Sequence, residues 1–426
     1  MAREMKDSGI EWIGEIPRSW GICRLRFLCN ILTGNQDTQD NDPDGKYPFY
    51  VRSPIVEKSN SFTFEGDDIL MAGDGVGAGK VFHYVSGKYG CHQRVYSLQK
   101  ITGISRRFLY YYLQNRFYIS IETANSKSTV DSVRLNMLQD FSVTIPNCEE
   151  QQSIAVFLDT QCAHIDSVIE KTRAAIEKYK KLKQAVITQA VTKGIRPNRQ
   201  MKDSGIEWIG EVPSAFVCRK LKSLALLISK GATPKDISIE LDNRHIVRFL
   251  KSENIVDNHL KEKPEFRITT DIHEGELKRS VLSENDILFV IAGASIGKTA
   301  VMEIGLLPAN TNQAVSFIRI ESKYCFAKKY IWYFLQSEVV KRFIFLFAVQ
   351  SAQPNLSMEN LGSIRMPFPK SKEEVLEIIT YLDEKTAAID SLIQKKEQLI
   401  TELEAYKKSL IYEYVTGKKE VPVHAH

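Results

Sequence analysis

The amino-acid sequence predicts a protein of the α/β class, of α+β type, with two globular domains in tandem and a long helix after each. The first observation is an internal repeat, because the eleven residues MKDSGIEWIGE at 5–15 recur unchanged at 201–211. The second is a texture of short apolar runs, glycines and β-branched residues after each copy, which is typical of strands and turns. The third is that residues 149–193 contain neither proline nor glycine, which favours one long helix.

The repeat has a period near 200 residues. Each copy is therefore a domain-sized unit, because solenoids and propellers have periods of roughly 20–50 residues. Asp68-Ile69-Leu70 corresponds to Asp286-Ile287-Leu288, and residues 158–194 align without a gap on 382–418. The shift between the copies grows from 196 to 218 positions, which predicts an insertion of about 22 residues in the second copy, between Phe216 and Asp286.

Composition places the chain among ordinary folded proteins, with 43% hydrophobic and 26% charged residues in 426. A net charge of +5 is compatible with DNA binding, but it is smaller than the charge of strongly basic domains, which indicates nucleic-acid binding by itself. The seven cysteines form no CxxC pair, which indicates free thiols in a reducing compartment. No apolar run approaches the roughly 20 residues that span a bilayer. We therefore expect a cytoplasmic protein with no membrane association.

Within each half, the pattern predicts strands joined by turns, together with shorter helices. Strands are expected in 46–51, 68–85, 246–249 and 287–302, and helices in 106–123 and 327–347. Residues 195–200, which include Pro197, form the expected joint between the halves. The chain is thus predicted to consist of a globular domain at 1–148, a long helix at 149–196, a second globular domain at 197–370 and a second long helix at 371–426.

Both long helices carry apolar residues at heptad spacing. The expected seam consists of Ile154, Leu158, Ile165, Val168, Ala175, Tyr179, Leu182 and Val186 in the first helix, and of Leu382, Ile389, Leu392, Leu399, Leu403, Tyr406 and Leu410 in the second. A helix that only covers a core rarely sustains such a seam beyond roughly 25 residues. We therefore expect the two helices to pack on each other as an antiparallel coiled coil. The alternative is that each helix covers its own domain.

The segment from Gly293 to Thr299 resembles a phosphate-binding loop but does not fit one. That loop needs four residues between its glycines so that consecutive N–H groups wrap the phosphates, and three lie between Gly293 and Gly297. In the first copy, Val81 takes the place of the metal-binding hydroxyl residue. We therefore exclude nucleotide hydrolysis. Lys80 and Lys298 are expected either in tight turns beside strands or in contact with DNA phosphates.

Corresponding polar loops hold residues that are suited to base recognition. His92-Gln93-Arg94 in the first copy corresponds to Asn312-Gln313 in the second. In the major groove, glutamine and asparagine pair bidentately with adenine, and arginine pairs with guanine. Gln93, Arg94, Asn312 and Gln313 are therefore candidate DNA contacts. The alternative is that these loops are only solvated.

No motif predicts catalysis or a metal site. The chain has no Gly-x-Ser-x-Gly, His-Glu-x-x-His or Asn-Pro-Pro-Tyr type segment. His83, Cys91 and His92 lie close together in sequence, but their spacing fits no zinc pattern and the second copy lacks them. We expect a chain with no catalytic residue, metal or cofactor of its own.

In their order along the chain, these segments resemble the specificity subunit of type I restriction-modification enzymes. The resemblance rests on MKDSGIEWIGE followed by Pro17 and Trp20, on the Asp-Ile-Leu and Gly-Lys segments, on Glu150-Gln151 at the start of a long helix, and on Val-Thr-Lys-Gly or Val-Thr-Gly at its end. It covers essentially the whole chain in both halves.

The resemblance implies that each globular domain is a target recognition domain for one part of a split, asymmetric DNA site. The paired helices then act as a spacer and as a docking surface. It implies a non-catalytic subunit that works with double-stranded DNA, two methyltransferase subunits and two restriction/translocase subunits, which hold S-adenosylmethionine, ATP and Mg²⁺. It also marks a DNA-facing loop before the last strand of each domain, with the candidates Ser126, Lys127, Ser128, Gln350, Ser351 and Gln353.

Two other functions stay open on the sequence alone. One is a self-contained nuclease or methyltransferase fused to its own DNA reader, which DNA cleavage or methylation by the purified chain would reveal. The other is a coiled-coil scaffold that joins protein partners and reads no DNA. A footprint of the assembled complex on DNA distinguishes the scaffold from the specificity subunit.

Overall fold

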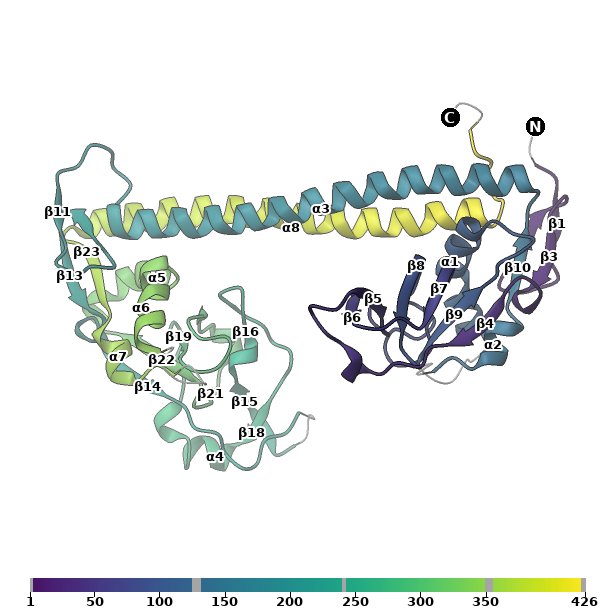
Figure 1. Ribbon diagram of the computed structural model, residues 1–426. Helices are drawn as coiled ribbons and strands as arrows, with labels where there is room; N and C mark the ends of the chain where they lie inside the picture. The colour runs from purple at the N-terminus through teal and green to yellow at the C-terminus, as the bar shows by residue number, and fades with distance from the viewer. Residues whose placement is uncertain (1–2, 125–131, 240–242, 349–354, 423–426) are drawn as a thin grey trace. The chain divides into compact units, whose positions relative to one another are not determined.

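The computed structural model describes residues 3–124, 132–239, 243–348 and 355–422 (Figure 1). The chain divides into two compact units: unit 1 contains residues 1–173 and 397–426, and unit 2 contains residues 174–396. Each unit holds one globular domain, the first part of the long helix that follows it and the last part of the other long helix. The mixed class of helices and strands is therefore as the sequence predicts.

The strands of unit 1 form a hairpin, a two-stranded ribbon and a six-stranded sheet. β1 (Met5–Asp7) pairs with β2 (Glu15–Pro17), and β3 (Gly21–Arg24) pairs with β10 (Ser142–Ile145). The sheet has the order β4-β9-β7-β8-β5-β6, with β4 (Asn30–Thr33), β5 (Tyr47–Tyr50), β6 (Glu57–Ser59), β7 (Phe64–Ala72), β8 (Phe82–Cys91) and β9 (Val95–Gln99). β5 and β8 run parallel, and the other neighbours run antiparallel.

The core of unit 1 forms where helix α1 (Arg106–Ala124) covers the sheet. Apolar side chains recur every three or four residues along α1, and Phe108, Tyr112 and Phe117 are fully buried. They share one cluster with Ile69 of β7 and with residues of both long helices, among them Leu158 and Leu410. A short helix, α2 (Leu135–Gln139), precedes β10.

Unit 2 repeats this plan, with two smaller sheets in place of the six-stranded one. β11 (Met201–Asp203) pairs with β12 (Glu211–Pro213), and β13 (Phe216–Lys220) pairs with β23 (Arg365–Pro369). A four-stranded sheet has the order β14-β22-β19-β20, with β14 (Ala225–Lys230), β19 (Ile287–Val290), β20 (Thr299–Val301) and β22 (Val315–Ile320). A three-stranded sheet has the order β18-β15-β21, with β15 (His245–Leu250), β18 (Arg267–Thr269) and β21 (Ala309–Thr311).

Most of the extra residues of the second copy lie after β15. The main-chain N–H of His92 donates to the carbonyl of Tyr50, and that of Asn312 donates to the carbonyl of Leu250, so these pairs correspond at shifts of 220 and 200 positions. Most of the growth to 218 therefore falls between 251 and 286, within the range that the sequence predicts. That stretch forms a small hairpin of β16 (Ile255–Val256) and β17 (His259–Leu260), then β18 and helix α4 (Thr270–Glu274).

The helical segment expected at 327–347 is confirmed, and it consists of two helices, α5 (Lys328–Leu335) and α6 (Glu338–Ala348). The break at Gln336 and Ser337 is supported from the first long helix. Gln184 donates its amide to the carbonyl of Gln336, and the N–H of Glu338 donates to the hydroxyl of Thr188 at 3.0 Å. Side chains in another element thus supply the hydrogen bonds that a continuous helix would form internally.

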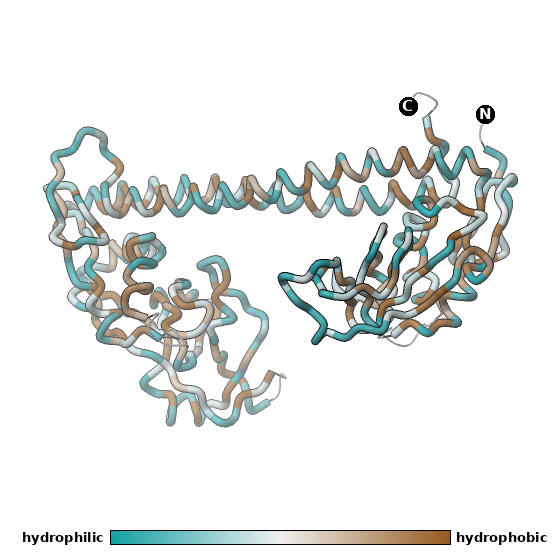
Figure 2. The backbone as a smooth tube through the Cα atoms, in the orientation of Figure 1, coloured by the Kyte–Doolittle hydropathy of each residue, from teal (hydrophilic) through white to brown (hydrophobic). Residues whose placement is uncertain are grey.

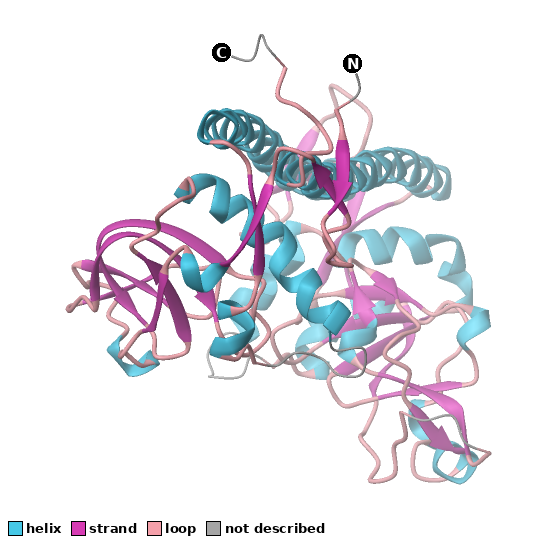
Figure 3. Ribbon diagram, turned by 90° about the vertical axis from the view of Figure 1, so that its right-hand side faces the viewer, coloured by secondary structure: helices cyan, strands magenta, loops and turns pink. Residues whose placement is uncertain are grey.

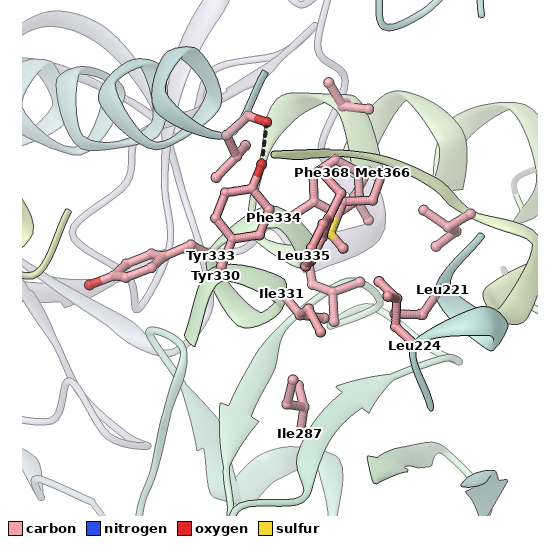
Figure 4. Packing of buried hydrophobic residues seen from close by; sticks show 14 of the residues in the cluster. Leu221, Leu224, Ile287, Tyr330, Ile331, Tyr333, Phe334, Leu335, Met366 and Phe368 are labelled. Carbon is pink, nitrogen blue, oxygen red and sulfur yellow. Dashed lines mark hydrogen bonds between the residues drawn. The ribbon is translucent and has the colours of Figure 1, made fainter. Parts of the chain in front are cut away.

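The core of unit 2 gathers around α5. Figure 4 shows Tyr330 and Phe334 beside Met366 and Phe368 of β23. The hydroxyl of Tyr330 donates to the carbonyls of Val191 and Pro367 at 3.0 and 2.7 Å. The end of the first long helix is thereby fixed to this domain. α7 (Met358–Ser363) then leads into β23.

Both long helices are confirmed, as α3 (Cys148–Lys193) and α8 (Lys372–Val415). The side chains of Asn147 and Ser371 accept hydrogen bonds from the N–H groups three residues on, at 2.9 and 3.3 Å, and so cap the helix starts. Gly194 and Gly417 follow the helix ends with φ of +72° and +71°, a conformation that glycine adopts readily. Local sequence therefore determines where both helices begin and end.

The two long helices pack antiparallel within each unit (Figure 1, Figure 3). In unit 1, Lys407 pairs with Asp166 and Glu404 pairs with Arg173. Residue numbers therefore decrease along α8 as they increase along α3, which makes the helices antiparallel. In unit 2, Lys183 pairs with Asp390. Ile165, Ile169 and Ile176 of α3 and Ile389, Leu410 and Ile411 of α8 are buried. The predicted antiparallel coiled coil is confirmed at this level.

Part of the expected helix seam is wrong. Ile154, Leu158, Ile165, Leu382, Ile389 and Leu410 are buried as expected. Leu182, Leu392, Leu399 and Tyr406, however, are 39–55% exposed. The seam runs one residue further on, through Ile169, Thr172, Ile176 and Lys183, and it includes half-buried lysines whose long stems pack among apolar groups. The prediction considered apolar residues only. It therefore placed part of the seam one residue too early, because polar residues occupy some of the positions that face the other helix.

No helix among the described residues combines the length and the apolar character that crossing a membrane requires.

Candidate nucleic-acid interface

Each unit places a glycine-rich turn between two antiparallel strands. Residues 73–81 join β7 to β8, and residues 291–298 join β19 to β20. The N–H of Gly79 donates to the carbonyl of Ala72 at 2.9 Å, and that of Gly297 donates to the carbonyl of Val290 at 2.9 Å. A phosphate-binding loop joins a strand to the start of a helix instead. These turns therefore present residues from the edge of a hairpin.

The last glycine of each turn packs against a helix. Gly79 and Gly297 have φ of +67° and +88°, which other residues rarely adopt. A Cβ on Gly79 would lie 3.3 Å from the ring of Phe117 in α1, and one on Gly297 would lie 2.7 Å from Cδ1 of Ile344 in α6. The close approach fixes both turns on their domains, and the next residues, Lys80 and Lys298, are exposed.

Lys80 stands between two hollows of unit 1. Its ammonium lies 4.1 Å from the ring centre of Tyr118 in α1. One hollow, of 600 Å³, is lined by Arg52, Asp74 and Val76 among others. The second, of 610 Å³, is lined by residues of α1, α3 and α8. Lys80 is therefore accessible for a phosphate contact while its position is supported by an aromatic ring.

The predicted polar loops are tight turns that adjoin the glycine-rich turns. The N–H of Gly73 donates to the carbonyl of Arg94, and the N–H of Ile291 donates to the carbonyl of Ala314, both at 2.8 Å. Gln93 and Gln313 occupy equivalent, exposed positions. Gln93 donates its amide to Asp37 at 3.0 Å, and Gln313 accepts from the hydroxyl of Thr233. Both glutamines are thus held in place with part of the amide group left for another partner.

Gly34 and Gly231 allow this arrangement, and sequence reasoning missed both. A Cβ on Gly34 would lie 2.0 Å from the carbonyl oxygen of Cys91, and one on Gly231 would lie 1.6 Å from that of Thr311. Any other residue would push apart the strand and the turn that carries the glutamine. The sequence does contain a signal for this close approach, because a glycine directly follows the first strand of the sheet in each copy, β4 and β14.

The residues beside the two glutamines differ in burial. Arg94 is exposed, whereas Asn312 is half-buried and its Oδ1 has no hydrogen-bond partner among the described residues. His92, the counterpart of Asn312, is buried with Nε2 3.3 Å from a carboxylate oxygen of Asp37. A hydrogen bond from the N–H of Thr38 is the main reason that the pKa of Asp37 is lowered, and its carboxylate is therefore an anion beside this turn. His83 and Cys91 face other partners, the carbonyls of Ser53 and Val95.

The third predicted set of contacts lies outside the described residues: Ser126, Lys127, Ser128, Gln350, Ser351 and Gln353. The residues that follow these loops are described. The N–H of Val133 donates to the carbonyl of Gly73 at 2.7 Å, and the N–H of Leu356 donates to the carbonyl of Ile291 at 2.8 Å. In both units the chain therefore returns from this loop directly beside the glycine-rich turn.

Three segments thus converge at one place in each unit: the glycine-rich turn, the polar turn and the end of the following loop. The sequence predicted the glycine-rich turn and the polar turn as separate features. Two side chains at the point where they meet, Arg52 and Asp74, were not predicted. Arg52 donates to Asp74 at 3.1 Å. The only feature of the sequence that indicated Arg52 was a basic residue just after an expected strand. Contact of each candidate residue with DNA stays a prediction.

Comparison with known proteins supports one family. A family model described as "Type I restriction modification DNA specificity domain" matches residues 17–178 and again 213–402. The EcoDI specificity subunit of Escherichia coli is 32% identical over 178 residues, which are 42% of this chain and 39% of that protein. The MjaVIII specificity subunit of Methanocaldococcus jannaschii is 25% identical over 425 residues, covering 95% of this chain and 94% of that protein.

A solved structure shares the fold. It is described as the structural basis underlying complex assembly and conformational transition of the type I R-M system. The match has a TM-score of 0.68 at 15% identity, and it covers 95% of this chain and 99% of that one. The likeness extends across both repeats.

Proposed function

Because the chain belongs to the family of type I restriction-modification DNA specificity subunits, we propose that its two globular domains read two different halves of one split DNA site. Sequence-specific DNA recognition is the role of this family, and a specificity subunit is the non-catalytic component of its enzyme. The family model matches each repeat separately, which supports one reader in each.

One observation carries the proposal of two different half-sites. The same three segments converge in both units with the same main-chain hydrogen bonds, yet they present different side chains. Asp74 and Arg94 of unit 1 correspond to Ala292 and Ala314 of unit 2, while Gln93 and Gln313 are shared. The main chain is arranged alike in the two units, but the side chains that it presents differ. This favours two DNA-reading domains that dock in a similar way and prefer different bases.

The proposed complex contains partners for all of the chemistry. We assign methylation to two methyltransferase subunits that hold S-adenosylmethionine, and DNA cleavage to two restriction/translocase subunits that use ATP and Mg²⁺. The names of the relatives describe specificity subunits of type I restriction enzymes, which supports this class of partner.

The long helices offer matching surfaces for two methyltransferase subunits. Unit 1 exposes Leu399 and Tyr406 on α8, one heptad apart and therefore on one face. Unit 2 carries Ala175 and Leu182 at the equivalent positions of α3, and Leu182 is 48% exposed. Figure 2 shows hydrophobic residues recurring along both helices. Exposed apolar side chains on a helix mark protein contact sites. Leu399 and Tyr406 in unit 1 and Leu182 in unit 2 therefore support one methyltransferase contact per unit.

Modified-base sequencing of a host that carries the complete system, with this gene intact or deleted, tests the proposal. We expect one gapped, asymmetric methylated motif that disappears with the gene. A methylome that does not change on deletion contradicts the proposal and favours a scaffold that reads no DNA. A motif without a gap, or one with two identical halves, contradicts the assignment of two unlike readers.

A further inference from the structure

Unit 1 holds two arginines on a single carboxylate at the place where its three segments converge. Nη1 of Arg52 lies 3.1 Å from Oδ1 of Asp74, and Nε of Arg94 lies 3.6 Å from Oδ2. Each guanidinium group therefore pairs with a different oxygen of one carboxylate, so that both are held at the same time.

The three residues come from three different segments. Asp74 lies in the glycine-rich turn, Arg94 in the polar turn, and Arg52 just after β5. Asp74 also forms a β-bridge with Ser132, at the end of the following loop. Asp74 therefore links these segments of unit 1 in two ways: its carboxylate pairs with Arg52 and Arg94, and its main chain pairs with the end of the following loop.

The burial of the three side chains fits a supported contact group. The side chain of Asp74 is 23% exposed, that of Arg52 is 44% exposed and that of Arg94 is 64% exposed. The carboxylate is thus the inner member and the guanidinium of Arg94 the outer one. A guanidinium carries five N–H donors, so an ion pair through one nitrogen leaves donors for a second acceptor.

The arrangement belongs to unit 1 alone among the two equivalent sites. Unit 2 has Ala292 in place of Asp74 and Ala314 in place of Arg94. Leu250 corresponds to Tyr50, which puts Ser252 in the place of Arg52. Whatever the trio does should therefore affect one half of a split site.

We propose that Arg94 reads the guanine of a G·C base pair in the half-site of unit 1, with Asp74 and Arg52 as positioning residues; this rests on the proposed function. Arginine pairs bidentately with O6 and N7 of guanine, the commonest specific contact in the major groove. Fixing the guanidinium beforehand reduces the ordering cost of that contact. A carboxylate beside the arginine opposes a contact with a DNA phosphate by like-charge repulsion, so the trio fits a base edge better than the backbone.

The test compares methylation specificities of complete complexes assembled with the wild-type chain, Arg94→Gln, Arg94→Lys and Asp74→Asn. Genomic methylation is scored at the wild-type motif and at every sequence that differs from it by one base pair. We expect Arg94→Gln to lower discrimination roughly ten- to hundred-fold at one G·C pair of one half-site. Arg94→Lys keeps the charge but lacks the planar fork, and should relax the same pair. Asp74→Asn should relax it less.

The chain supplies a matched control. Arg24 and Arg26 share the carboxylate of Asp140 in the same unit. Arg24 ends β3, Arg26 follows it, and Asp140 follows α2, so all three lie outside the converging segments. Arg24→Gln removes an arginine from the same kind of pair and should leave the specificity unchanged. The other half-site, read without change by every variant, shows that each variant complex is folded and assembled.

The outcomes separate this inference from the proposed function. A wild-type motif with one G·C pair relaxed by both Arg94 variants supports it. Methylation that falls uniformly at all sites, or that is normal with Arg94→Lys and low with Arg94→Gln, identifies a phosphate contact and overturns it. Relaxation in both half-sites also overturns it. If the wild-type complex itself yields no gapped motif, the proposed function fails first.

Discussion

Lys183 of α3 and Asp390 of α8 form a two-pronged ion pair in the helix seam of unit 2, with Nζ 2.7 and 2.6 Å from the two carboxylate oxygens. Lys407 and Asp166 form the same pair in unit 1, at the same two distances. Both residues of one pair lie 224 positions from their counterparts in the other. A polar pair in a helix seam specifies register more than stability. The two pairs therefore align α3 and α8 in both units.

We predict a modest loss of stability when the carboxylate of this pair is removed. Asp390→Ala leaves the half-buried ammonium of Lys183 without its partner and should lower the free energy of unfolding by about 0.5–1 kcal/mol, since the side chain of Asp390 is 45% exposed. Lys183→Met removes the charge and keeps the packing, so its effect should stay near zero or be stabilising. Denaturant unfolding measures both. Glu177→Ala, which breaks an exposed pair with Lys180, is the control, and an equal loss there contradicts a role for the seam position.

The glycine-rich turn of unit 2 should tolerate alanine unequally. Gly293 and Gly297 have φ of +84° and +88°, but a Cβ on Gly293 meets nothing within 4 Å, whereas one on Gly297 meets Ile344. Gly293→Ala should cost about 1 kcal/mol from backbone strain, and Gly297→Ala about 2–3 kcal/mol. Thermal melting provides the measurement. Adding Ile344→Val to Gly297→Ala should recover part of the difference, and no recovery would show that the clash is not its source.

Unit 1 should lose stability as the solution becomes acidic, through His83. Burial lowers the pKa of this imidazole below its usual value of 6.5, and the ring packs on Tyr50 with Nε2 3.1 Å from the carbonyl of Ser53. The unfolded chain therefore takes up a proton at pH values where the folded chain does not. This contribution to stability is fully present above about pH 6.5 and is lost as the pH falls below it.

Melting temperatures at about pH 7.5 and 5.5 check this prediction. The wild-type protein should lose more on acidification than His83→Gln does. His164 is exposed on α3, and His164→Gln should behave like the wild type. Equal losses in all three proteins would place the acid sensitivity in other groups.

The equivalent glutamines should each affect one half-site. Gln93→Ala should relax discrimination at an A·T pair in the half-site of unit 1 by about 1–3 kcal/mol, and Gln313→Ala should do so in the other half-site. Methylation by the assembled complex of duplexes that carry every single base change measures this. Gln114→Ala, an exposed position on α1, should leave specificity unchanged. A loss that is uniform across sequences would show that the glutamines contact the DNA backbone.

Much of the fold follows from local signals in the sequence. The repeat of MKDSGIEWIGE gives the two domains, and the absence of proline and glycine between the caps Asn147 and Gly194 gives the first long helix. The glycine-rich and polar turns correspond between the copies as expected, because glycine is required wherever the backbone has positive φ or approaches another strand closely. The division into four segments at 148, 196 and 370 stays a prediction.

The rest depends on packing that periodicity does not encode. The helix seam holds Lys183 and Lys407, so apolar spacing selected Leu182 and Tyr406 in the next row. The break between α5 and α6 is stabilised by Gln184 and Thr188, which are more than 140 positions away. Arg52 and Asp74 meet Arg94 only because the sheet order brings three segments together. Such contacts between distant residues cannot be read from any one stretch of sequence.

The most direct test of two independent readers replaces residues 17–148 with the corresponding segment of another specificity subunit, so that β3 and β10 are exchanged together as one pair. The methylated motif of the complete complex is then sequenced. We expect one half-site to change, while the half-site read by the second repeat stays as it was. A motif that changes in both halves, or that keeps both, would contradict the claim that each globular domain reads its own half of the site.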